Sequence, residues 1–154
     1  ALQVYLHEHW PEIPEQQGVF GICSGDVNAR NFHIDCDRGI TLFDFDQCGF
    51  GYRAFEIGKF VSSLHKHELK QDLLNAFVGG YQEIRQLAAR ELEAIAYFEI
   101  VAVLWVMAIH ANNANRIGHQ KLEHRYWEER IQVLKSLLSR QEAAADIITN
   151  ADKP

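Results

Sequence analysis

The chain has 154 residues, of which 47% are hydrophobic and 11% aromatic, and this is enough apolar material for one globular domain with a buried core. Its net charge of −6 argues against a nucleic-acid partner, because phosphate binding needs clustered Lys and Arg rather than an acidic surface. The three cysteines have no CxxC spacing, which argues against a disulfide framework or a zinc site and favours a reducing, cytoplasmic location.

The N-terminal residues 1–15 carry charged and histidine side chains where the apolar segment of a signal peptide would lie. Residues 2–10 instead have the pattern of the end of an amphipathic helix, stopped by Pro11 and Pro14. The chain also begins with Ala1 in place of a methionine. We therefore expect further sequence upstream.

The next predicted element is a β-hairpin. Residues 32–35 and 40–43 are short strand-like runs, and the CDRG sequence between them suits a tight turn. After Gly51 the pattern becomes helical, and helices are expected in succession at residues 53–65, 67–86, 89–113 and 123–141. Residues 142–154 are expected to be a frayed tail. The predicted class is therefore α+β, mainly α-helical, with one short hairpin followed by about four helices.

Residues 94–109, in the third predicted helix, form the most apolar stretch of the chain. The stretch is shorter than the roughly 20 residues that a membrane span needs, and it contains Glu99. A helix of the protein core is therefore favoured, and no membrane partner is expected.

Three oxygen-bearing side chains flank the predicted hairpin. Asp26 and Asn31 lie in the loop before its first strand, and Asp44 follows its second strand. Because a short hairpin brings its two flanks close together, we expect these side chains to converge. Such oxygen ligands suit Mg²⁺, which binds through one or two carboxylates and completes its shell with water and phosphate. The pattern indicates phosphoryl transfer, in which one acid accepts the proton of the attacking hydroxyl while an Asp and an Asn hold the metal.

Each of these residues also has an ordinary structural explanation. A single Asp or Asn in a loop is most often a turn or cap residue, and an Asp after a strand often caps the element that follows. Only the combined spacing favours the catalytic interpretation, so both explanations are open at this point.

The same region resembles the aminoglycoside phosphotransferase and choline kinase family. That family has a catalytic loop of pattern HGDxxxxN, then a hairpin, a DFD or DFE segment, and a stretch rich in Gly, Tyr and Arg that leads into a helix. This chain has SGDVNARN, then FHIDCDRGITLF, then DFDQCGFGYRAFEIGKF, without a gap over residues 21–60. The resemblance implies the C-terminal lobe of a protein-kinase-like fold.

The resemblance also implies an ATP-dependent phosphotransferase that acts on a hydroxyl of a small molecule, such as an aminoglycoside, choline or a similar alcohol. Its cofactors would be Mg²⁺ and ATP or another nucleoside triphosphate. By position, Asp26 would be the catalytic base, while Asn31 and Asp44 would bind the metal and, through it, the nucleotide phosphates. Asp46 would either touch a second metal ion or only cap the following turn.

The chain departs from the family pattern at three positions. Ser24 replaces the His before Gly-Asp, which leaves the base with looser support. Asn28 stands where the family usually has a His, and the related protein kinases a Lys, so a phosphate contact is expected to be missing. Arg30 is either a substitute source of positive charge or simply solvated. Glu56 stands where the family has an Asp that hydrogen-bonds back to the catalytic-loop backbone.

The residues before Gly21 are too few for the family's N-terminal lobe, which covers the nucleotide, so we expect that lobe to be absent from this chain. Because much of the catalysis of phosphoryl transfer comes from positioning the phosphates, residues 1–154 alone are expected to be inactive or weak. Two alternatives stay open: a pseudoenzyme that binds nucleotide or a small molecule, and a fragment with a structural or pairing role.

A homodimer is a further expectation. In the family, the N-terminal lobe covers the hairpin and the start of the C-terminal lobe. The apolar residues of this region are therefore expected to lack part of their cover and to favour a twofold dimer; they are Val19, Phe20, Ile22 and Phe43.

Overall fold

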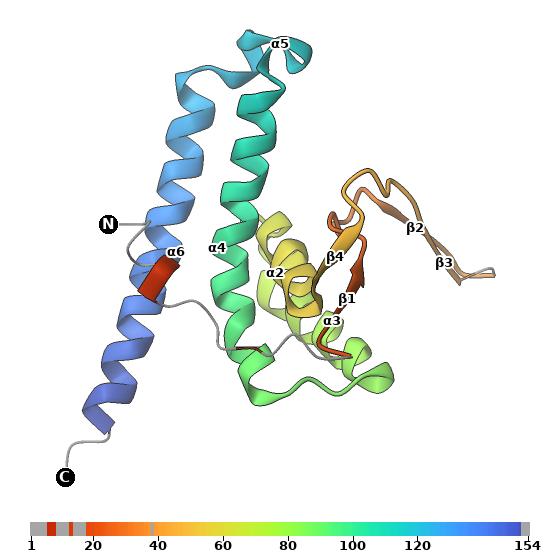
Figure 1. Ribbon diagram of the computed structural model, residues 1–154, viewed down its shortest axis with the longest axis vertical. Coiled ribbons are helices and arrows are strands. Elements are labelled where there is room, and N and C mark those ends of the chain that lie inside the picture. The colour runs from red at the N-terminus through yellow and green to blue at the C-terminus, as the bar shows by residue number, and fades with distance from the viewer. Residues whose placement is uncertain (1–5, 9–12, 14–17, 38, 152–154) are drawn as a thin grey trace. The chain divides into compact units, whose positions relative to one another are not determined.

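The computed structural model describes residues 6–8, 13, 18–37 and 39–151, and Figure 1 shows its elements. The chain divides into two compact units, Ala1–Ala102 and Val103–Pro154, and the division falls within one long helix. The elements in chain order are β1 (Phe20–Cys23), β2 (Phe32–Asp35), β3 (Gly39–Leu42), β4 (Gly49–Tyr52), α2 (Arg53–Ser63), α3 (Lys70–Ile84), α4 (Ala89–Asn112), α5 (Ala114–Ile117), the 3₁₀ helix η1 (His119–Leu122) and α6 (His124–Ala151).

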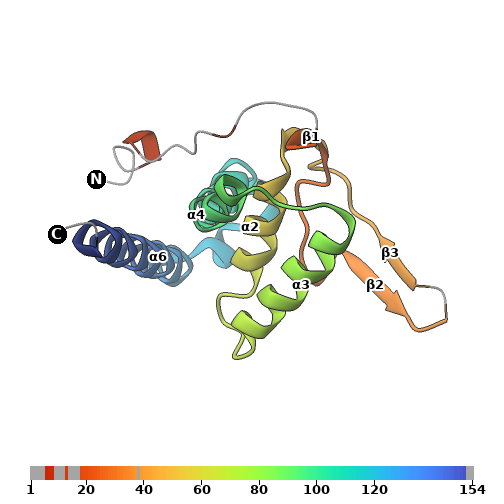
Figure 2. The ribbon, with the colours of Figure 1, turned by 90° about the horizontal axis from the view of Figure 1, so that it is seen from below.

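The predicted hairpin is confirmed. Strands β2 and β3 pair antiparallel, with Phe32 opposite Leu42 and Asp35 opposite Gly39. Gly39 has a φ of +88°, and a Cβ atom there would meet nothing within 4 Å, so its role is to supply the left-handed turn conformation. All four residues of β3 are exposed, and Figure 2 shows the hairpin extending away from the helices of its unit.

The predicted helices correspond to α2, α3, α4 and α6, and the described residues are mainly helical, as expected. The predicted end of the last helix at Gln141 was wrong, because α6 continues to Ala151. Residues 143–145 are three consecutive alanines, the residue with the highest helix propensity, which explains the longer helix. The predicted tail, residues 142–154, overlaps this helix up to Ala151, and its last three residues lie outside the described part of the chain.

A second antiparallel pair, β1 with β4, was not predicted. Phe20 lies opposite Tyr52, and Cys23 lies opposite Gly49. Two of the four residues of β4 are glycines, which are depleted in strands, and its partner is distant in sequence. Figure 1 shows β1 beside β4, with the β2–β3 hairpin projecting beyond them. The loop that precedes β2 and the segment that follows β3 therefore both emerge from one strand pair.

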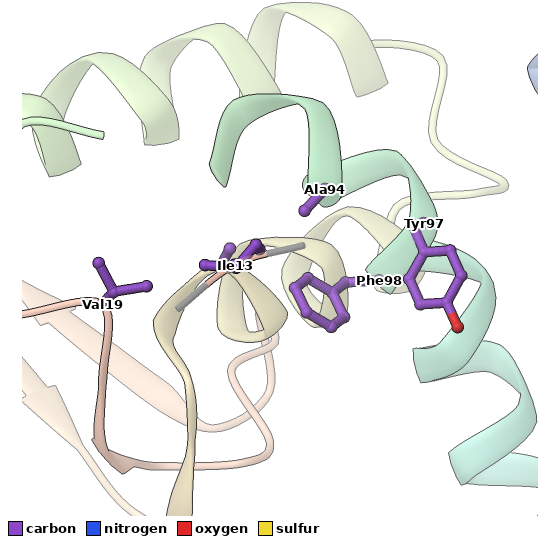
Figure 3. Close-up of a cluster of buried hydrophobic side chains, with 6 residues drawn as sticks. Ile13, Val19, Ala94, Tyr97 and Phe98 are labelled. Atoms are coloured by element: carbon purple, nitrogen blue, oxygen red, sulfur yellow. The ribbon is translucent and has the colours of Figure 1, made fainter. Parts of the chain in front are cut away.

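Helix α2 is central to the first unit. It begins directly after β4 and contributes Ala54 to a core cluster whose other buried members are Ile13, Val19, Ala94, Tyr97 and Phe98 (Figure 3). At Gly58 a Cβ atom would lie 2.7 Å from the Cβ of Phe98, so only glycine allows α2 to come this close to α4. A second cluster joins Ile57 and Val61 of α2 to Leu87 and Ile95. These contacts give α2 a fixed position from which its polar side chains can act.

Helix α4 contains two buried carboxylates within the first unit. Glu91 pairs with Arg85, and Glu99 pairs with Lys70. Burial is the largest single influence on the pKa of Arg85 and lowers it, but the hydrogen bonds and charge interactions with Glu91 and Tyr81 together outweigh burial, so the net shift of the pKa is upward. By length and composition alone, α4 is also apolar enough to cross a membrane, and 39% of its most apolar window is buried.

The second unit, from Val103 onward, includes α5, η1 and α6. Gly118 has a φ of +92° and separates α5 from η1. The indole Nε1 of Trp127, in the first turns of α6, donates a hydrogen bond of 3.0 Å to the carbonyl of Leu122. The neighbouring Tyr126 hydroxyl contacts Nδ1 of His110. These contacts fix the turn that leads into α6.

Candidate catalytic site

The loop between β1 and β2, residues 24–31, is anchored at Gly25. Its backbone N–H donates a hydrogen bond of 2.9 Å to Oε1 of Glu56 in α2. Gly25 has a φ of +78°, and a Cβ atom there would lie 2.2 Å from the carbonyl oxygen of Gln47. The expected return contact from position 56 to the loop is thus confirmed, and the longer Glu side chain is accommodated.

Asp26 and Asn31 are brought together in this loop. The Nδ2 group of Asn31 donates to Oδ2 of Asp26 at 2.9 Å and also to the Asp26 carbonyl at 2.9 Å. The Asp26 side chain is about one-fifth exposed, at 21%. The carboxylate is therefore oriented by a neighbour while one side of it remains open to a ligand.

Asn28 is engaged within the same loop. Its Nδ2 group donates to the Asp26 carbonyl at 3.0 Å, and its Oδ1 atom accepts from the Arg30 backbone N–H at 2.9 Å. This is the turn-forming use of Asn that local side-chain to backbone hydrogen bonds allow. Arg30 itself is exposed. The loop therefore presents no buried cation of its own beside Asp26.

Asp44 follows β3 in a strained conformation. Its φ of +63° is the only positive φ of a non-glycine residue in the described part of the chain. Asp adopts this left-handed conformation more readily than most non-glycine residues, and such residues cluster at functional sites. The N–H of Phe43 donates to the Asn31 carbonyl at 3.1 Å, which ties the backbone before Asp44 to the loop. The Asp44 carboxylate is exposed.

Asp46 lies in the turn closed by a hydrogen bond of 2.9 Å from the Cys48 N–H to the Phe45 carbonyl, and it is also exposed. Within the ranges that the structure describes, no group of three or more His, Cys, Asp or Glu side chains could hold a metal ion. A cation here would therefore need an amide ligand, water or a bound phosphate in addition to carboxylates, as Mg²⁺ accepts.

Sequence reasoning missed Lys59. This residue of α2 is only 3% exposed, and its Nζ lies 3.1 Å from Oδ1 of Asp26. It follows Glu56 by three positions, so the two side chains lie on the same side of the helix, and both contact the loop. The sequence does contain a signal that could have pointed to Lys59, because it lies among the residues that α2 buries. A buried Lys is rare unless its charge is paired.

The strand pair β1–β4 forms the base of the loop. The Sγ atom of Cys23 contacts the carbonyl of Gly51 across the pair at 3.5 Å. Burial, and to a smaller extent the negative charge of Glu56, raises the pKa of the Cys23 thiol to about 11. A thiol with this pKa is protonated at neutral pH and is a poor nucleophile. The Cys23 thiol is therefore not expected to act as a nucleophile in this region.

Comparison with protein families identifies a match over the first part of the chain. The model of the "Phosphotransferase enzyme family" matches residues 1–96. An uncharacterized protein of Synechocystis is 33% identical over 125 residues, covering 81% of this chain and 35% of that protein. An uncharacterized protein of Deinococcus radiodurans is 32% identical over 113 residues, covering 71% and 33%. The chain spans about a third of the length of these curated relatives.

Solved structures give the fold. The microcompartment-associated aminopropanol kinase matches with a TM-score of 0.60 and 27% identity, over 69% of this chain and 34% of that one. The amicoumacin kinase hAmiN, in complex with AMP-PNP, Ca²⁺ and Ami, matches with a TM-score of 0.65 and 21% identity, over 90% and 44%. The arrangement of hairpin and helices is that of the C-terminal lobe of the kinase-like fold.

Proposed function

Because the chain belongs to the phosphotransferase enzyme family, we propose that it is the catalytic lobe of an ATP-dependent enzyme that phosphorylates a hydroxyl of a small molecule. The observation that carries this proposal is the Asp26 carboxylate held at 2.9 Å by Asn31, in a loop that Glu56 anchors to α2. One solved relative is an aminopropanol kinase, which supports an amino alcohol or a similar small alcohol as the acceptor.

Asp26 is the base in this proposal. Its open side accepts the proton of the acceptor hydroxyl while the hydroxyl oxygen bonds to the γ-phosphorus and the bond to the leaving ADP breaks. The hydrogen bond from Asn31 fixes the orientation of the carboxylate toward the acceptor. Orientation matters here because the enzyme's contribution to phosphoryl transfer is mainly positioning and electrostatic stabilisation.

Asn31 and Asp44 are the proposed metal ligands, with Asp46 as a further candidate. The residues fit a hard cation: the Nδ2 group of Asn31 is used on Asp26, which leaves its Oδ1 atom as a ligand, and the Asp44 carboxylate is exposed. The complex of hAmiN with AMP-PNP and Ca²⁺ supports a nucleotide together with a divalent ion. When bound, Mg²⁺ would neutralise charge on the nucleotide phosphates.

We further propose that residues 1–154 alone turn over weakly or not at all, since the described residues offer a base and metal ligands but no cover for a nucleotide. The cysteine pattern favours a cytoplasmic location for the enzyme. The alternative of a pseudoenzyme has one observation in its favour, which is Ser24 in the place of the usual His.

The test uses the protein as encoded, with any sequence that adjoins these residues, and a panel of amino alcohols and aminoglycosides. Phosphoryl transfer from radiolabelled ATP is expected, and Asp26→Asn should lower kcat by about 10²- to 10⁴-fold with nucleotide affinity retained. Asp44→Asn should abolish Mn²⁺-dependent nucleotide binding, whereas Asp37→Asn in the exposed hairpin turn should behave as wild type. Binding without turnover would indicate the pseudoenzyme, and absence of both would refute the proposal.

A further inference from the structure

Lys59 is the buried cation of the site, and its ammonium is not hydrogen-bonded. The residue is 3% exposed, and Nζ lies at ion-pair distance, 3.1 Å, from Oδ1 of Asp26. Even so, Nζ has no hydrogen-bond partner with acceptable geometry in the described part of the chain. An ammonium can donate three hydrogen bonds, so this one is held in the core by charge attraction to a single carboxylate.

Other ion pairs of the same unit are built differently. The Lys70 ammonium and the Arg85 guanidinium each donate a hydrogen bond to their carboxylate partners, Glu99 and Glu91. Burying a charge with incomplete hydrogen bonding is costly, and an apolar side chain of the same size is often at least as stable in such a position. Lys59 is therefore poorly explained as a stabilising core residue, and its contact with the site is the better explanation.

The position of Lys59 complements the loop. Asn31 holds Oδ2 of Asp26, and Lys59 faces Oδ1, so the two carboxylate oxygens are each restrained by a different element. Asn28, at the loop position where the family usually has a His, uses both polar atoms of its side chain on the loop backbone. Helix α2 thus places beside Asp26 the positive charge that the loop does not provide.

We propose that Lys59 is a positioning residue that fixes the Asp26 carboxylate from the core side, so that its open side faces the acceptor hydroxyl. The role of Asp26 as base rests on the proposed function. The contact between Lys59 and Asp26, and the effect of that contact on the loop, do not depend on the proposed function. The two claims can therefore be tested separately.

The kinetic test compares Lys59→Met with Lys70→Met in the protein as encoded. Loss of alignment at the base should lower kcat about 100-fold, with less than about threefold change in KM for ATP. Lys70→Met removes another ion-paired lysine of the same unit, less buried than Lys59, whose partner is Glu99, so its kcat should stay within about twofold of wild type. Added to Asp26→Asn, Lys59→Met should change kcat less than about twofold, because its partner is already neutral. The proposal would be overturned if the losses in kcat caused by Lys59→Met and Asp26→Asn were additive. It would also be overturned if Lys70→Met lowered kcat as much as Lys59→Met.

A second test needs no activity. The side-chain amide resonances of Asn31 report its hydrogen bond to Asp26, and Lys59→Met should shift and broaden them while Lys70→Met leaves them unchanged. If Lys59→Met does not fold, Lys59→Gln, which keeps a donor without the charge, should give the same spectral change. Unchanged Asn31 resonances in the folded Lys59 variant would refute the positioning role. Shifted resonances in a protein without any turnover would support that role while the proposed function fails.

Discussion

The loop of residues 24–31 and the hairpin that follows it are neighbours in sequence, but different contacts hold them in place. In residues 24–31 the backbone and side-chain polar groups contact α2 and one another, through Glu56, Lys59 and Asn31. The β2–β3 hairpin has its strand pairing, yet Ile34 and Ile40 are 61% and 68% exposed. The contacts within the chain thus hold the loop that carries Asp26, whereas the hairpin leaves apolar side chains exposed.

The largest effect is expected where the loop backbone is most tightly packed. Gly25→Ala would place a Cβ atom 2.2 Å from the Gln47 carbonyl at a φ of +78°. Since backbone must move to relieve this contact, we expect a loss of about 3 kcal/mol or more in the free energy of unfolding, measured by urea denaturation.

The matched control is Gly39→Ala in the hairpin turn, where φ is +88° but nothing lies within 4 Å of the new atom. Only conformational strain remains there, so the expected loss is about 1–2 kcal/mol. Equal losses at the two glycines would contradict the contrast between a packed loop and an open hairpin.

Removing the anchor from α2 should have the next largest effect. Glu56→Ala leaves the Gly25 N–H without its acceptor at 2.9 Å, and an unsatisfied, partly buried donor costs about 1–3 kcal/mol. Hydrogen exchange of the Gly25 amide should accelerate in proportion. Glu83→Ala, at an exposed position of α3, serves as the control and should change stability by less than about 0.5 kcal/mol. An unchanged exchange rate at Gly25 would show that the anchor is not needed.

These contrasts also show what the sequence can predict. The hairpin has alternating apolar residues and a turn sequence, helices α2, α3 and α6 have an amphipathic period, and α4 contains the apolar stretch of residues 94–109, so local patterns located them. The pair β1–β4 depends on contacts between distant segments and contains two glycines in one strand, so local propensity pointed away from it.

Burial was harder to predict than secondary structure. Val19 was expected to lack part of its cover, but it is only 8% exposed and belongs to the core cluster with Ile13 and Phe98. Lys59 was overlooked because charged residues are rarely buried, and its partner Asp26 lies in a different element. The Asp26–Asn31 contact follows from their loop spacing, whereas their catalytic roles and that of Asp44 stay predictions.

The cysteines of the strand pair below the loop and of the hairpin region should differ in their reactivity toward an alkylating reagent. Cys23 in β1 is buried with a pKa raised to about 11, while Cys36 in the hairpin turn and Cys48 after it are exposed. At pH 7.5 iodoacetamide should label Cys36 and Cys48 at least about 100-fold faster than Cys23, as mass spectrometry of peptides would show.

The raised pKa of Cys23 also predicts the direction in which the stability of the fold changes with pH. The neutral thiol is favoured in the folded chain, so its contribution to stability is fully present below the ordinary thiol pKa of 9.0 and is lost as the pH rises toward about 11. Cys23→Ala should remove this part of the alkaline decline, whereas Cys36→Ala should leave it unchanged. Rapid labelling of Cys23 at neutral pH would contradict both expectations.

The smallest effect on the fold is expected at the uncovered apolar surface, where the consequence is association instead. Ile22 is 64% exposed and Phe43 is 44% exposed, in line with the expected lack of cover for these two residues. Because exposed apolar side chains contribute little to the stability of a single chain, Ile22→Lys with Phe43→Lys should change stability by less than about 0.5 kcal/mol per site.

If the chain forms the expected twofold dimer through this surface, sedimentation at micromolar concentrations should show a dimer that the double variant converts to monomer. Glu83→Lys, at an exposed position of α3, changes a charge outside this apolar surface and should leave the dimer intact. A wild-type chain that sediments as a monomer at all these concentrations would show that the exposed residues do not pair two copies.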